Sequence, residues 1–600
     1  MPYANLAQMF FQRADELADR PRYRFRRGDS WDEVTWTEMA RRVREIAAGL
    51  IAMGVAPGDR VALLSGTRPE WMEVDLAILA CGALTVPIYQ SNLPSECGYI
   101  IANSESSVVV VENAKQRAKI DEVTQRGFEL DGVTQKVAIR GLVTMDGDGG
   151  GEGLEGLMTR GRAALSTANA EIARRIDAIR RDQLATIVYT SGTTGPPKGV
   201  LQTHGNHLAA VEAVRNTGIA REGDVDFFFL PLAHSFARLV EYLGLFVGTV
   251  TAFARSIDTL AEDMASARPH IVPAVPRVYE KLFARVQSAR EAASPLRRAL
   301  LDWAIGVGRV RGRFQEQGQA PPALVQLQHA LAHRLVLSRI HGLLGGNVRY
   351  MVSGGAPLSR EIAEFFLAVG IPILEGYGLT ETTPILTSNR PDRFRLGTVG
   401  LPLECCEVRL ASDGEILARG ANVALGYHRR PEATAESWDP EGWFHTGDIG
   451  EFDADGFLRI TDRKKDLIKT SGGKYIAPQK IENMLKLQPH VSQAVVIGDN
   501  KKYCVALVTL DPEEVARWGK AHGRDFRSSE DMAADAEIQK LIDGEIAQVN
   551  RELASYESIK YFRILPRDLT TESGELTPSL KVKRKVVAER YRREIEEMYA

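Results

Sequence analysis

VYTSGTTGPPKGV, residues 188–200, joins a run of apolar residues to a loop of glycine, hydroxyl and lysine side chains. The apolar run over 185–189 has the composition of a buried strand. Glycine lets the backbone approach a polyphosphate closely, hydroxyl and amide groups donate hydrogen bonds to it, and lysine neutralises its charge. The spacing differs from the common nucleotide loop G-x-x-x-x-G-K-[ST], because Lys198 follows two prolines and precedes a glycine. The stretch therefore fits either a polyphosphate loop or a solvated loop after an edge strand.

The chain around this loop alternates between helical and strand-like patterns. Residues 36–55 repeat apolar side chains at helical spacing, and 60–66 and 84–89 resemble strands with an amphipathic helix between them. Such an alternation predicts a parallel sheet with crossover helices. Residues 277–345 predict mostly helix, with a polar break at about 318–322.

The pattern changes after Val399, where short strands and tight turns follow one another. Asp455-Gly456 marks a β-hairpin, and mixed helix and strand patterns return after about residue 463. The expected fold is α/β, with a large N-terminal domain of layered sheets and helices over residues 1–461. A small, mobile α+β domain is expected over residues 462–600, with the boundary at Asp462-Arg463.

Length, charge and cysteine usage narrow the class of protein. A chain of 600 residues is too long for one compact core, and a net charge of −3 argues against a dedicated nucleic-acid-binding protein. The N-terminus lacks the apolar segment of a signal peptide, and neither of the longest uncharged runs, 76–94 and 242–254, suits a transmembrane helix. Five cysteines show neither metal-ligand nor disulfide spacing. These features predict a cytoplasmic protein.

Six further motifs follow the opening loop along the chain. They are LPLAHSFAR at 230–238, VSGGAPL at 352–358, EGYGLTET at 375–382, WFHTGDIG at 443–450, DRKKDLIKTSGGKYIAP at 462–478 and LTPSLKVKR at 576–584. Together with the loop, they resemble in kind and order the motifs of the AMP-forming adenylating superfamily, which includes acyl-CoA synthetases, luciferases and the adenylation domains of peptide synthetases. The preceding chain fits the N-terminal subdomain of that family.

The resemblance implies that a carboxylate attacks the α-phosphate of ATP. Two anions must meet in this reaction, so the site has to cancel charge, and Mg²⁺ does part of this by binding the phosphates. Glu381 matches the carboxylate that holds the metal in the family, and Thr190 matches the hydroxyl that assists it. Lys198 is expected to help hold the β- and γ-phosphates, which leave as pyrophosphate.

The resemblance also implies a nucleotide site. Asp448 matches the aspartate that accepts both ribose hydroxyls, with Arg463 as its helper, and Tyr377 matches the tyrosine that stacks on adenine. The other face of the adenine is expected to lie against Gly354, Gly355, Ala356 and Pro357. Further nucleotide contacts are expected from Thr190, Ser191, Gly192, Thr193, Thr194, Gly195, Lys198, Glu375, Gly376, Gly378, Thr380, Lys465 and Lys469.

Lys581 is the expected catalytic lysine. It ends the sequence PSLK, where many family members have P-x-G-K, and a leucine at the glycine position is usual in the long-chain branch. A lysine there would bridge the carboxylate and the α-phosphate, whereas composition alone would make it one charge of a solvated basic run. Because Lys581 lies far from the phosphate loop, the small domain must close to deliver it. Lys465 matches the hinge about which that domain then rotates, so that Gly472 and Gly473 line a tunnel for the thiol of coenzyme A.

The helical insertion over 277–345 and the motifs at 230–238, 462–478 and 576–584 resemble the long-chain fatty acyl-CoA synthetase branch, which implies a long-chain fatty acid as the substrate. His234 would lie near the carboxylate and the phosphates, or serve only in packing. The run 241–254 offers small and apolar residues for the wall of an acyl channel, although an ordinary core segment has the same composition. The segment 581–600 suggests a peripheral contact with the inner face of the membrane, but its acids favour a solvated terminal helix.

Three functions are compatible with these motifs. The leading one is a long-chain fatty acid–CoA ligase that uses ATP, Mg²⁺ and coenzyme A. The second is a fatty acyl-AMP ligase that loads a carrier protein, which usually carries an insertion that 443–581 lacks. The third is a silent nucleotide-binding regulator, which intact Glu381, Asp448 and Lys581 argue against. The sequence leaves open the preferred length of the acyl chain, the acyl acceptor (coenzyme A or a carrier protein) and the oligomeric state, for which a homodimer is one alternative.

Overall fold

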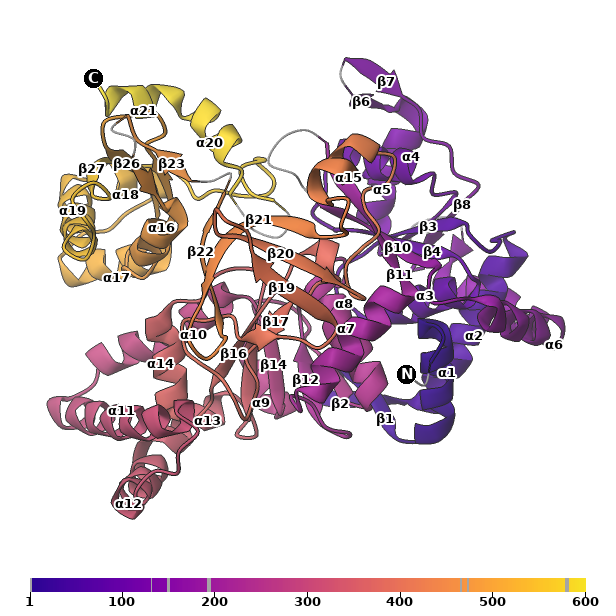
Figure 1. Ribbon diagram of the computed structural model, residues 1–600, viewed down its shortest axis with the longest axis horizontal. Coiled ribbons are helices and arrows are strands. Elements are labelled where there is room, and N and C mark those ends of the chain that lie inside the picture. Colours follow the sequence, from indigo (N-terminus) through magenta and orange to yellow (C-terminus); the bar gives the residue numbers. More distant parts are fainter. Residues whose placement is uncertain are drawn as a thin grey trace.

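The structure is a computed structural model of the chain. It describes residues 3–130, 132–147, 152–190, 196–464, 467–471, 474–577 and 582–600, apart from the side chains of Glu152 and Tyr475. Figure 1 shows a large body, coloured indigo to orange, beside a small lobe that carries the C-terminus in yellow. The expected α/β architecture with a large N-terminal part and a small C-terminal part is confirmed.

The largest sheet has nine strands in the order β18-β17-β16-β15-β14-β12-β13-β1-β2. They are β1 (Pro21–Arg27), β2 (Ser30–Thr35), β12 (Val225–Phe228), β13 (Val250–Phe253), β14 (Ile271–Ala274), β15 (Tyr350–Ser353), β16 (Ile373–Tyr377), β17 (Thr387–Ser388) and β18 (Leu401–Pro402). The central strands β12 to β16 pair in parallel. β1 also pairs in parallel with β13, where Tyr23 lies opposite Thr251. The hairpin of β1 and β2 therefore joins a sheet whose other strands come from much later in the sequence.

A second sheet has seven strands in the order β11-β10-β4-β3-β5-β8-β9. They are β3 (Arg60–Leu64), β4 (Leu84–Ile88), β5 (Val108–Val111), β8 (Gly141–Thr144), β9 (Glu152–Gly153), β10 (Leu184–Thr190) and β11 (Lys198–Thr203). β3 and β4 pair in parallel with Val61 opposite Thr85. The crossover between them is α3 (Pro69–Ala80), whose residues 71–80 are buried throughout. The parallel sheet predicted from the alternating pattern is confirmed.

Helices surround these sheets and form one projecting insertion. They are α1 (Leu6–Leu17), α2 (Trp36–Ala52), α4 (Pro94–Ser104), α5 (Ala114–Arg126), α6 (Leu154–Ala178), α7 (His204–Asn216), α8 (Ser235–Val247), α9 (Leu260–Ala267), α10 (Pro276–Glu291), α11 (Pro295–Glu316), α12 (Ala323–Ala332), the π-turn η1 (His333–Leu337), α13 (Ser338–Leu343) and α14 (Arg360–Val369). A short hairpin, β6 (Phe128–Leu130) with β7 (Val133–Gln135), lies beyond α5. The helices predicted over 277–345 and the break near 318–322 are confirmed. Figure 1 shows that α11 and α12 project from the large body at the lower left.

A four-stranded antiparallel sheet follows the two large sheets. Its strands are β19 (Cys406–Leu410), β20 (Glu415–Gly420), β21 (Phe444–Phe452) and β22 (Leu458–Arg463), and α15 (Pro431–Ser437) lies before β21. β21 and β22 form the hairpin predicted at Asp455-Gly456. The expected boundary residues Asp462 and Arg463 are the last two residues of β22. The division at 461/462 stays a prediction.

The C-terminal lobe is built on a three-stranded sheet in the order β25-β26-β27. Its elements are β23 (Ile468–Lys469), β24 (Tyr475–Ile476), α16 (Pro478–Lys486), β25 (Val491–Ile497), β26 (Cys504–Leu510), α17 (Pro512–Ala521), α18 (Ser529–Ala534), α19 (Ala536–Asn550), β27 (Ile559–Ile564), α20 (Arg584–Arg590) and α21 (Arg592–Glu597). Val587 in α20 and Ile595 in α21 are buried with Val505 of β26. The apolar side of the terminal segment therefore packs inside the lobe, as expected for a terminal helix of that domain. None of the helices in the described parts of the chain is long and apolar enough to cross a bilayer.

A buried polar network fixes α3, α8 and β10 to one another. Arg238 of α8 lies 2.9 Å from Asp75 of α3 and donates a 2.7 Å hydrogen bond to Thr186 of β10. The hydroxyl of Tyr242 donates to the second oxygen of Asp75 at 2.7 Å. The hydrogen bonds to Thr186 and from Tyr242 offset part of the cost of burying this ion pair. This network holds β10, which leads into the opening loop, against α8, which begins beside His234.

Candidate active site

The ends of the opening loop are held together by two antiparallel strands. Thr190 at the end of β10 lies opposite Lys198 at the start of β11, and its hydroxyl donates to the carbonyl oxygen of Lys198 at 3.4 Å. Ser191, Gly192, Thr193, Thr194 and Gly195 lie outside the described residues. The structure therefore places the two flanking residues side by side at the end of the hairpin.

The outer side of β11 is paired with the segment 424–428. The amide of Leu201 donates to the carbonyl of Gly426 at 3.0 Å, and the amide of His428 donates to the carbonyl of Gly199 at 2.7 Å. This pairing brings Tyr427 against Val200. The backbone contacts fix Tyr427 beside the base of the loop.

Lys198, Tyr427 and Glu381 form a continuous chain of contacts. The ammonium of Lys198 lies 4.7 Å from the centre of the Tyr427 ring, within the range of a cation–π contact. The hydroxyl of Tyr427 donates a 2.8 Å hydrogen bond to one carboxylate oxygen of Glu381. Burial and the charge of Glu381 both raise the pKa of Tyr427, so the hydroxyl stays protonated and remains a donor. Tyr427 lies in no recognised motif, and sequence reasoning missed it.

Glu381 itself is held through the backbone of a short 3₁₀ turn, η2 (Thr380–Thr382). The side-chain amide of Gln202 in β11 donates to the carbonyl of Thr380 at 2.6 Å. The amide of Ala424 donates to the carbonyl of Glu381 at 2.8 Å. Among the residues that the structure describes, no hydrogen bond reaches the second carboxylate oxygen of Glu381. That oxygen is available to a ligand.

Asp448 is buried between two donors. The hydroxyl of Tyr377 donates to one of its oxygens at 2.7 Å, and the Nε of Arg463 donates to the other at 2.8 Å. Arg463 lies directly opposite Asp448 across β21 and β22. Burial and the nearby Asp448 carboxylate raise the pKa of Tyr377 well above its ordinary value. The resemblance had given Tyr377 a stacking role, and the structure adds a hydrogen-bonding role for its hydroxyl.

The ends of β15 and β16 form a surface with little side-chain bulk. Ser353 lies opposite Glu375, and the chain leaves β15 through Gly354 and Gly355. Gly355 has a φ of +81°, which favours glycine. A Cβ on Gly378 would lie 1.9 Å from the carbonyl oxygen of Pro384, so only glycine fits there. Ala356 and Pro357 continue this surface and are exposed, whereas Gly376 is half-buried.

Glu375 differs from the other acids of this region because it is buried and has no charged partner among the described residues. Burial raises the pKa of its carboxyl to about 8. The carboxyl is therefore mostly protonated at neutral pH and acts as a neutral polar group. The sequence placed Glu375 at the nucleotide site but gave no sign of this state.

His234 and Lys469 lie on other elements. His234 caps α8, where its Nδ1 accepts a 3.1 Å hydrogen bond from the amide of Phe236, and its ring faces Tyr89 edge-on at 6.5 Å. Lys469 is exposed in β23 of the C-terminal lobe. Lys465, Gly472, Gly473 and Lys581 lie outside the described residues. Lys583, which does belong to them, lies 3.9 Å from Glu96 of α4 in the large body.

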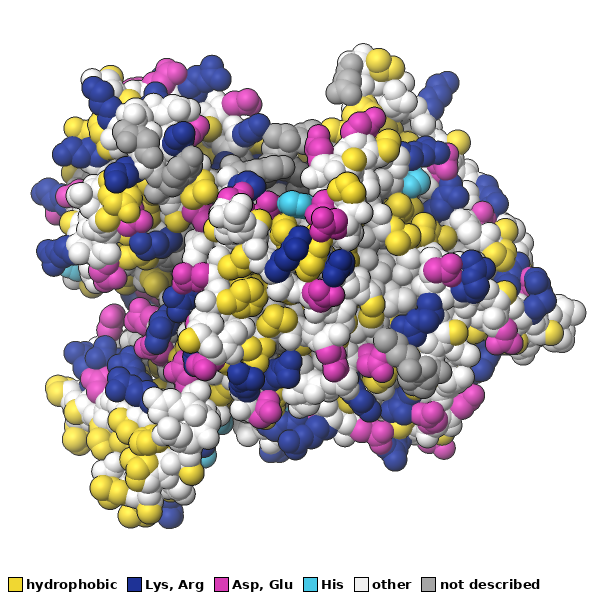
Figure 2. Space-filling view, in the orientation of Figure 1, with side chains coloured by type: hydrophobic (Ala, Val, Ile, Leu, Met, Phe, Trp, Pro, Cys, Tyr) yellow, Lys and Arg dark blue, Asp and Glu magenta, His cyan; other side chains and the backbone are white. Residues whose placement is uncertain are grey.

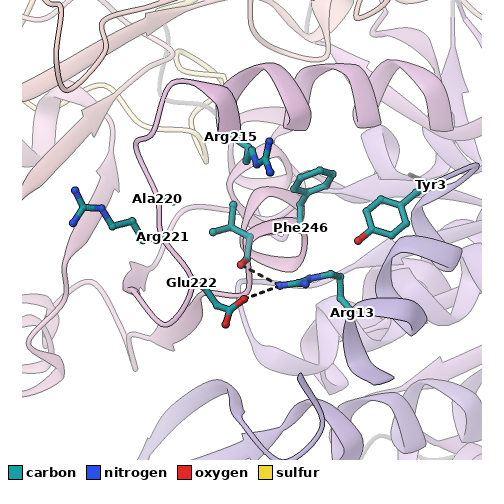
Figure 3. Close-up of a pocket in the computed structure, with 8 residues that line it drawn as sticks. Tyr3, Arg13, Arg215, Ala220, Arg221, Glu222 and Phe246 are labelled. Atoms are coloured by element: carbon teal, nitrogen blue, oxygen red, sulfur yellow. Dashed lines mark hydrogen bonds and ion pairs between the residues drawn. The ribbon is translucent and has the colours of Figure 1, made fainter. Parts of the chain in front are cut away.

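A separate surface pocket of about 400 Å³ lies at the other end of α8. Phe246 and Val247, the last residues of that helix, line it together with Tyr3 and Arg13. Figure 3 shows Arg13 reaching across to Glu222, and it also donates to the carbonyl of Val247 at 3.2 Å. No residue that the motifs single out lines this pocket.

Comparisons with solved structures agree with this architecture. The adenylation domain of a carboxylate reductase from Mycobacterium chelonae superposes with a TM-score of 0.74 at 24% identity, over 100% of this chain and 92% of that one. A Mycobacterium tuberculosis fatty acyl CoA synthetase superposes with a TM-score of 0.61 at 24% identity, over 98% of both chains. At these identities the likeness concerns the fold.

Comparisons of sequence find relatives with identities above 30%. The long-chain-fatty-acid–CoA ligase FadD15 of Mycobacterium bovis is 37% identical over 99% of this chain and 97% of its own. The peroxisomal long chain acyl-CoA synthetase 7 of Arabidopsis thaliana is 32% identical over 95% of this chain and 82% of its own. The family model of the AMP-binding enzymes matches residues 10–428, and the model of their C-terminal domain matches 465–600. The chain is a member of the AMP-binding enzyme family.

Proposed function

We propose that the protein is an AMP-forming long-chain fatty acid–CoA ligase. The carboxylate of a fatty acid attacks the α-phosphate of ATP, which forms an acyl-adenylate and releases pyrophosphate. The thiol of coenzyme A then attacks the acyl carbonyl, which forms the thioester and releases AMP. The proposal rests most directly on the relatives named long-chain-fatty-acid–CoA ligase, which match at 37% identity over nearly the full chain.

The structural observation that supports the adenylation step is the presence of two differently held carboxylates, Asp448 of β21 and Glu381, near the end of β16. Tyr377, which holds Asp448, is the last residue of that strand, and Glu381 follows four residues later. One carboxylate is buried and doubly bonded, whereas the other keeps an open oxygen. Such a pair suits a substrate with hydroxyl groups at one end and metal-bound phosphates at the other.

We assign the phosphate end to Thr190, Lys198 and Glu381. Lys198 supplies positive charge for the β- and γ-phosphates, and Tyr427 fixes the position of its ammonium. The open oxygen of Glu381 and the hydroxyl of Thr190 are hard oxygen donors of the kind that Mg²⁺ takes, and this ion usually binds through one or two carboxylates and the substrate phosphates. When bound, Mg²⁺ supplies charge neutralisation at the phosphoryl oxygens.

We assign the nucleoside end to Asp448 and the glycine surface. A carboxylate offers about four lone-pair positions, and Tyr377 and Arg463 occupy two of them. The remaining two can accept the ribose hydroxyls without breaking either protein contact. Gly354, Gly355, Ala356 and Pro357 would lie against adenine, and Glu375, Gly376, Gly378 and Thr380 would complete this side of the site.

The remaining roles come from the family resemblance. Lys581 would neutralise charge between the fatty acid carboxylate and the α-phosphate, and Lys469 would lie near the adenylate. Lys465 would act as the hinge of the C-terminal lobe, and Gly472 and Gly473 would line the path of the coenzyme A thiol. His234, at the start of α8, would contact the carboxylate of the substrate.

An acceptor-competition assay tests the function as a whole. Formation of AMP and acyl-CoA is measured over a series of saturated fatty acids, with a carrier protein offered as a competing acceptor. The expected products are AMP and the acyl-CoA of long-chain acids. Thioester formed only on the carrier protein would replace the proposal with an acyl-AMP ligase, and turnover of acetate or aromatic acids alone would exclude a fatty acid substrate.

A further inference from the structure

The projecting helical insertion carries an unusual share of exposed apolar side chains. Of fifteen large hydrophobic side chains exposed in the described parts of the chain, nine fall between residues 296 and 343. They are Leu296, Leu300, Trp303, Val310, Leu324, Leu327, Leu331, Leu335 and Leu343. Isolated exposed leucines are normal, but a concentration of this kind marks an interaction surface.

These side chains form a stripe along α11. Leu296, Leu300 and Trp303 are spaced by four and three residues, which places them on one face of a helix. The opposite face is packed tightly against α14. A Cβ on Gly308 would lie 2.0 Å from the carbonyl oxygen of Ala368. The helix therefore cannot turn its leucines inward without losing this close contact.

A second stripe lies along α12. Leu324, Leu327 and Leu331 repeat at spacings of three and four residues and are 65%, 70% and 51% exposed. The inner face of this segment is already used, because Ala332 and Leu337 are buried against α11. Both helices thus carry apolar side chains on the outward face as well as on the packed face. An ordinary surface helix has a polar outward face.

Figure 2 shows the hydrophobic side chains gathered over the lobe at the lower left, where α11 and α12 lie in Figure 1. In that view, the yellow surface covers much of the tip of the insertion, and dark blue Lys and Arg side chains lie mainly along its upper edge. We call the outward leucines and Trp303 of α11 and α12 the hairpin stripe, which consists of Leu296, Leu300, Trp303, Leu324, Leu327 and Leu331.

The charge of the insertion differs from that of the rest of the chain. Residues 295–343 contain seven arginines against Asp302 and Glu316, a formal charge of +5 in a protein whose net charge is −3. Six of these arginines are exposed, and their side chains make no ion pair with any described residue. They are Arg297, Arg298, Arg309, Arg313, Arg334 and Arg339. The hairpin stripe is therefore bordered by uncompensated positive charge.

We propose that the hairpin stripe docks the protein on an anionic lipid surface. Leucine and tryptophan side chains enter the boundary between headgroups and acyl chains, and the flanking arginines bind the lipid phosphates, as in other amphipathic surface anchors. The same positive charge would oppose the pairing of this face with a second copy of the chain. The inference goes beyond the ligase activity, since it concerns where the protein resides and not what it converts.

Vesicle flotation tests this docking surface. The full chain is mixed with vesicles of phosphatidylcholine that contain about 30 mol% phosphatidylglycerol, or with phosphatidylcholine alone. We expect binding to the anionic vesicles, weaker binding to the neutral ones, and a loss of binding at high salt. The variant Leu324→Ser/Leu327→Ser should lower the bound-to-free ratio about tenfold, because two leucines no longer enter the lipid.

A matched variant controls for the loss of exposed apolar surface as such. Val133 and Ile257 are 57% and 78% exposed and lie outside the insertion, so Val133→Ser/Ile257→Ser should bind vesicles like the wild type. A second variant, Arg334→Glu/Arg339→Glu, should lose selectivity for phosphatidylglycerol. Acyl-CoA formation from a long-chain fatty acid below its critical micelle concentration, measured without vesicles, should be the same for all these variants.

Three results would overturn the proposal. The wild type could fail to float with anionic vesicles, or the two serine variants could lose binding equally. Light scattering could also reveal a dimer that only Leu324→Ser/Leu327→Ser dissociates, without vesicle binding, in which case the face joins two copies of the chain. A protein that binds vesicles but forms no acyl-CoA would contradict the proposed function and leave the docking surface standing.

Discussion

Asp448 and Glu381 hold their negative charges in opposite ways. Asp448 is 6% exposed and receives a donor on each carboxylate oxygen, from Tyr377 and from Arg463. Glu381 is half-buried and receives one donor from the described residues, the hydroxyl of Tyr427. The first carboxylate is fixed before any ligand arrives, whereas the second keeps a coordination position.

This difference matches two kinds of ligand. Ribose hydroxyls are neutral donors, so a carboxylate that stays in place and keeps two lone-pair positions binds them without rearrangement. A hard cation needs a negatively charged oxygen that is not already engaged. Removal of either carboxylate should therefore give different kinetic signatures.

The largest effect is expected outside both carboxylates. Lys581→Ala should lower the rate of adenylation by about 10²–10³, because a preorganised charge at the reacting phosphoryl group is lost. Lys581 therefore differs from both carboxylates, because its charge acts only on the transition state. The measurement is pyrophosphate exchange into ATP at saturating substrates. Lys583→Ala is the matched control, because Lys583 is a nearby lysine that faces Glu96. Equal losses of the adenylation rate in the two variants would mean that the charge of the basic run matters and not Lys581 itself.

The second largest loss of rate is expected for Glu381→Gln. The amide keeps an acceptor for Tyr427 but removes the charge, so pyrophosphate exchange should fall about 10²-fold and the Mg²⁺ concentration for half-maximal rate should rise. Titration of Mg²⁺ at fixed ATP measures both effects. Glu407→Gln, whose carboxylate forms an exposed ion pair with Arg419, should behave as the wild type. An unchanged Mg²⁺ requirement would remove Glu381 from the metal site.

Asp448→Asn should act on binding more than on turnover. The asparagine weakens two hydrogen bonds to ribose and those to Tyr377 and Arg463, so the KM for ATP should rise about 10–100-fold. The kcat should change much less, because the contact exists in the ground state and in the transition state. Initial rates over a range of ATP concentrations separate the two. A fall in kcat with an unchanged KM would contradict ribose binding.

Tyr427→Phe tests the difference between the two carboxylates through a smaller expected effect, because it changes only the contact that holds Glu381. The ring under the ammonium of Lys198 remains, but the hydroxyl that holds Glu381 is lost. A single hydrogen bond to a charged group corresponds to about 1.5–3 kcal/mol, and Mg²⁺ can recover part of it, so a loss of about tenfold is expected. High Mg²⁺ should restore much of this rate. Tyr427→Ala, which also removes the cation–π contact, should not be restored to the same extent.

The smallest effect on turnover is expected for Glu375→Gln, which instead changes the pH dependence of stability. Burial raises the pKa of Glu375 to about 8, against about 4.3 for an ordinary glutamate. Between these values the unfolded chain releases a proton that the folded protein keeps. The free energy of unfolding therefore falls as pH rises through this window and levels off above it.

Glutamine does not titrate, so the variant should lack this contribution, which amounts to at most about 1.4 kcal/mol per pH unit. Urea unfolding from about pH 5 to pH 8 measures the slope for both proteins. Parallel curves would indicate that the Glu375 carboxyl is ionised in the folded protein.

The local parts of the fold could be predicted from the sequence. The alternation over 36–89 gave the parallel pair β3 and β4 because helical and strand periodicity are properties of short windows. The place of β1 beside β13 could not be predicted, since no local pattern encodes a pairing between Tyr23 and Thr251. Tyr427 was missed for the same reason, because its position depends on the pairing of β11 with 424–428.

The pairing of Asp448 with Arg463 could be predicted only in part. The hairpin at Asp455-Gly456 placed both residues on adjacent strands, but the register between β21 and β22 shifts by one residue between Ile449 and Gly450. Without that bulge, Asp448 would lie opposite Asp462, and two like charges would face each other. A one-residue irregularity therefore decides whether the carboxylate has a partner, and sequence patterns do not reveal it.

The place of β1 also constrains the order of events during synthesis. The strand needs β13 as its neighbour, and its Arg22 needs Glu241 of α8 as the partner of a buried charge. At about 5–20 residues per second, the ribosome takes about 10–50 s to go from the first segment to the second. For that time, β1 pairs only with β2 in a hairpin, and its other edge has no native neighbour. The sheet and the buried ion pair of Arg22 are completed only after α8 and β13 have left the ribosome.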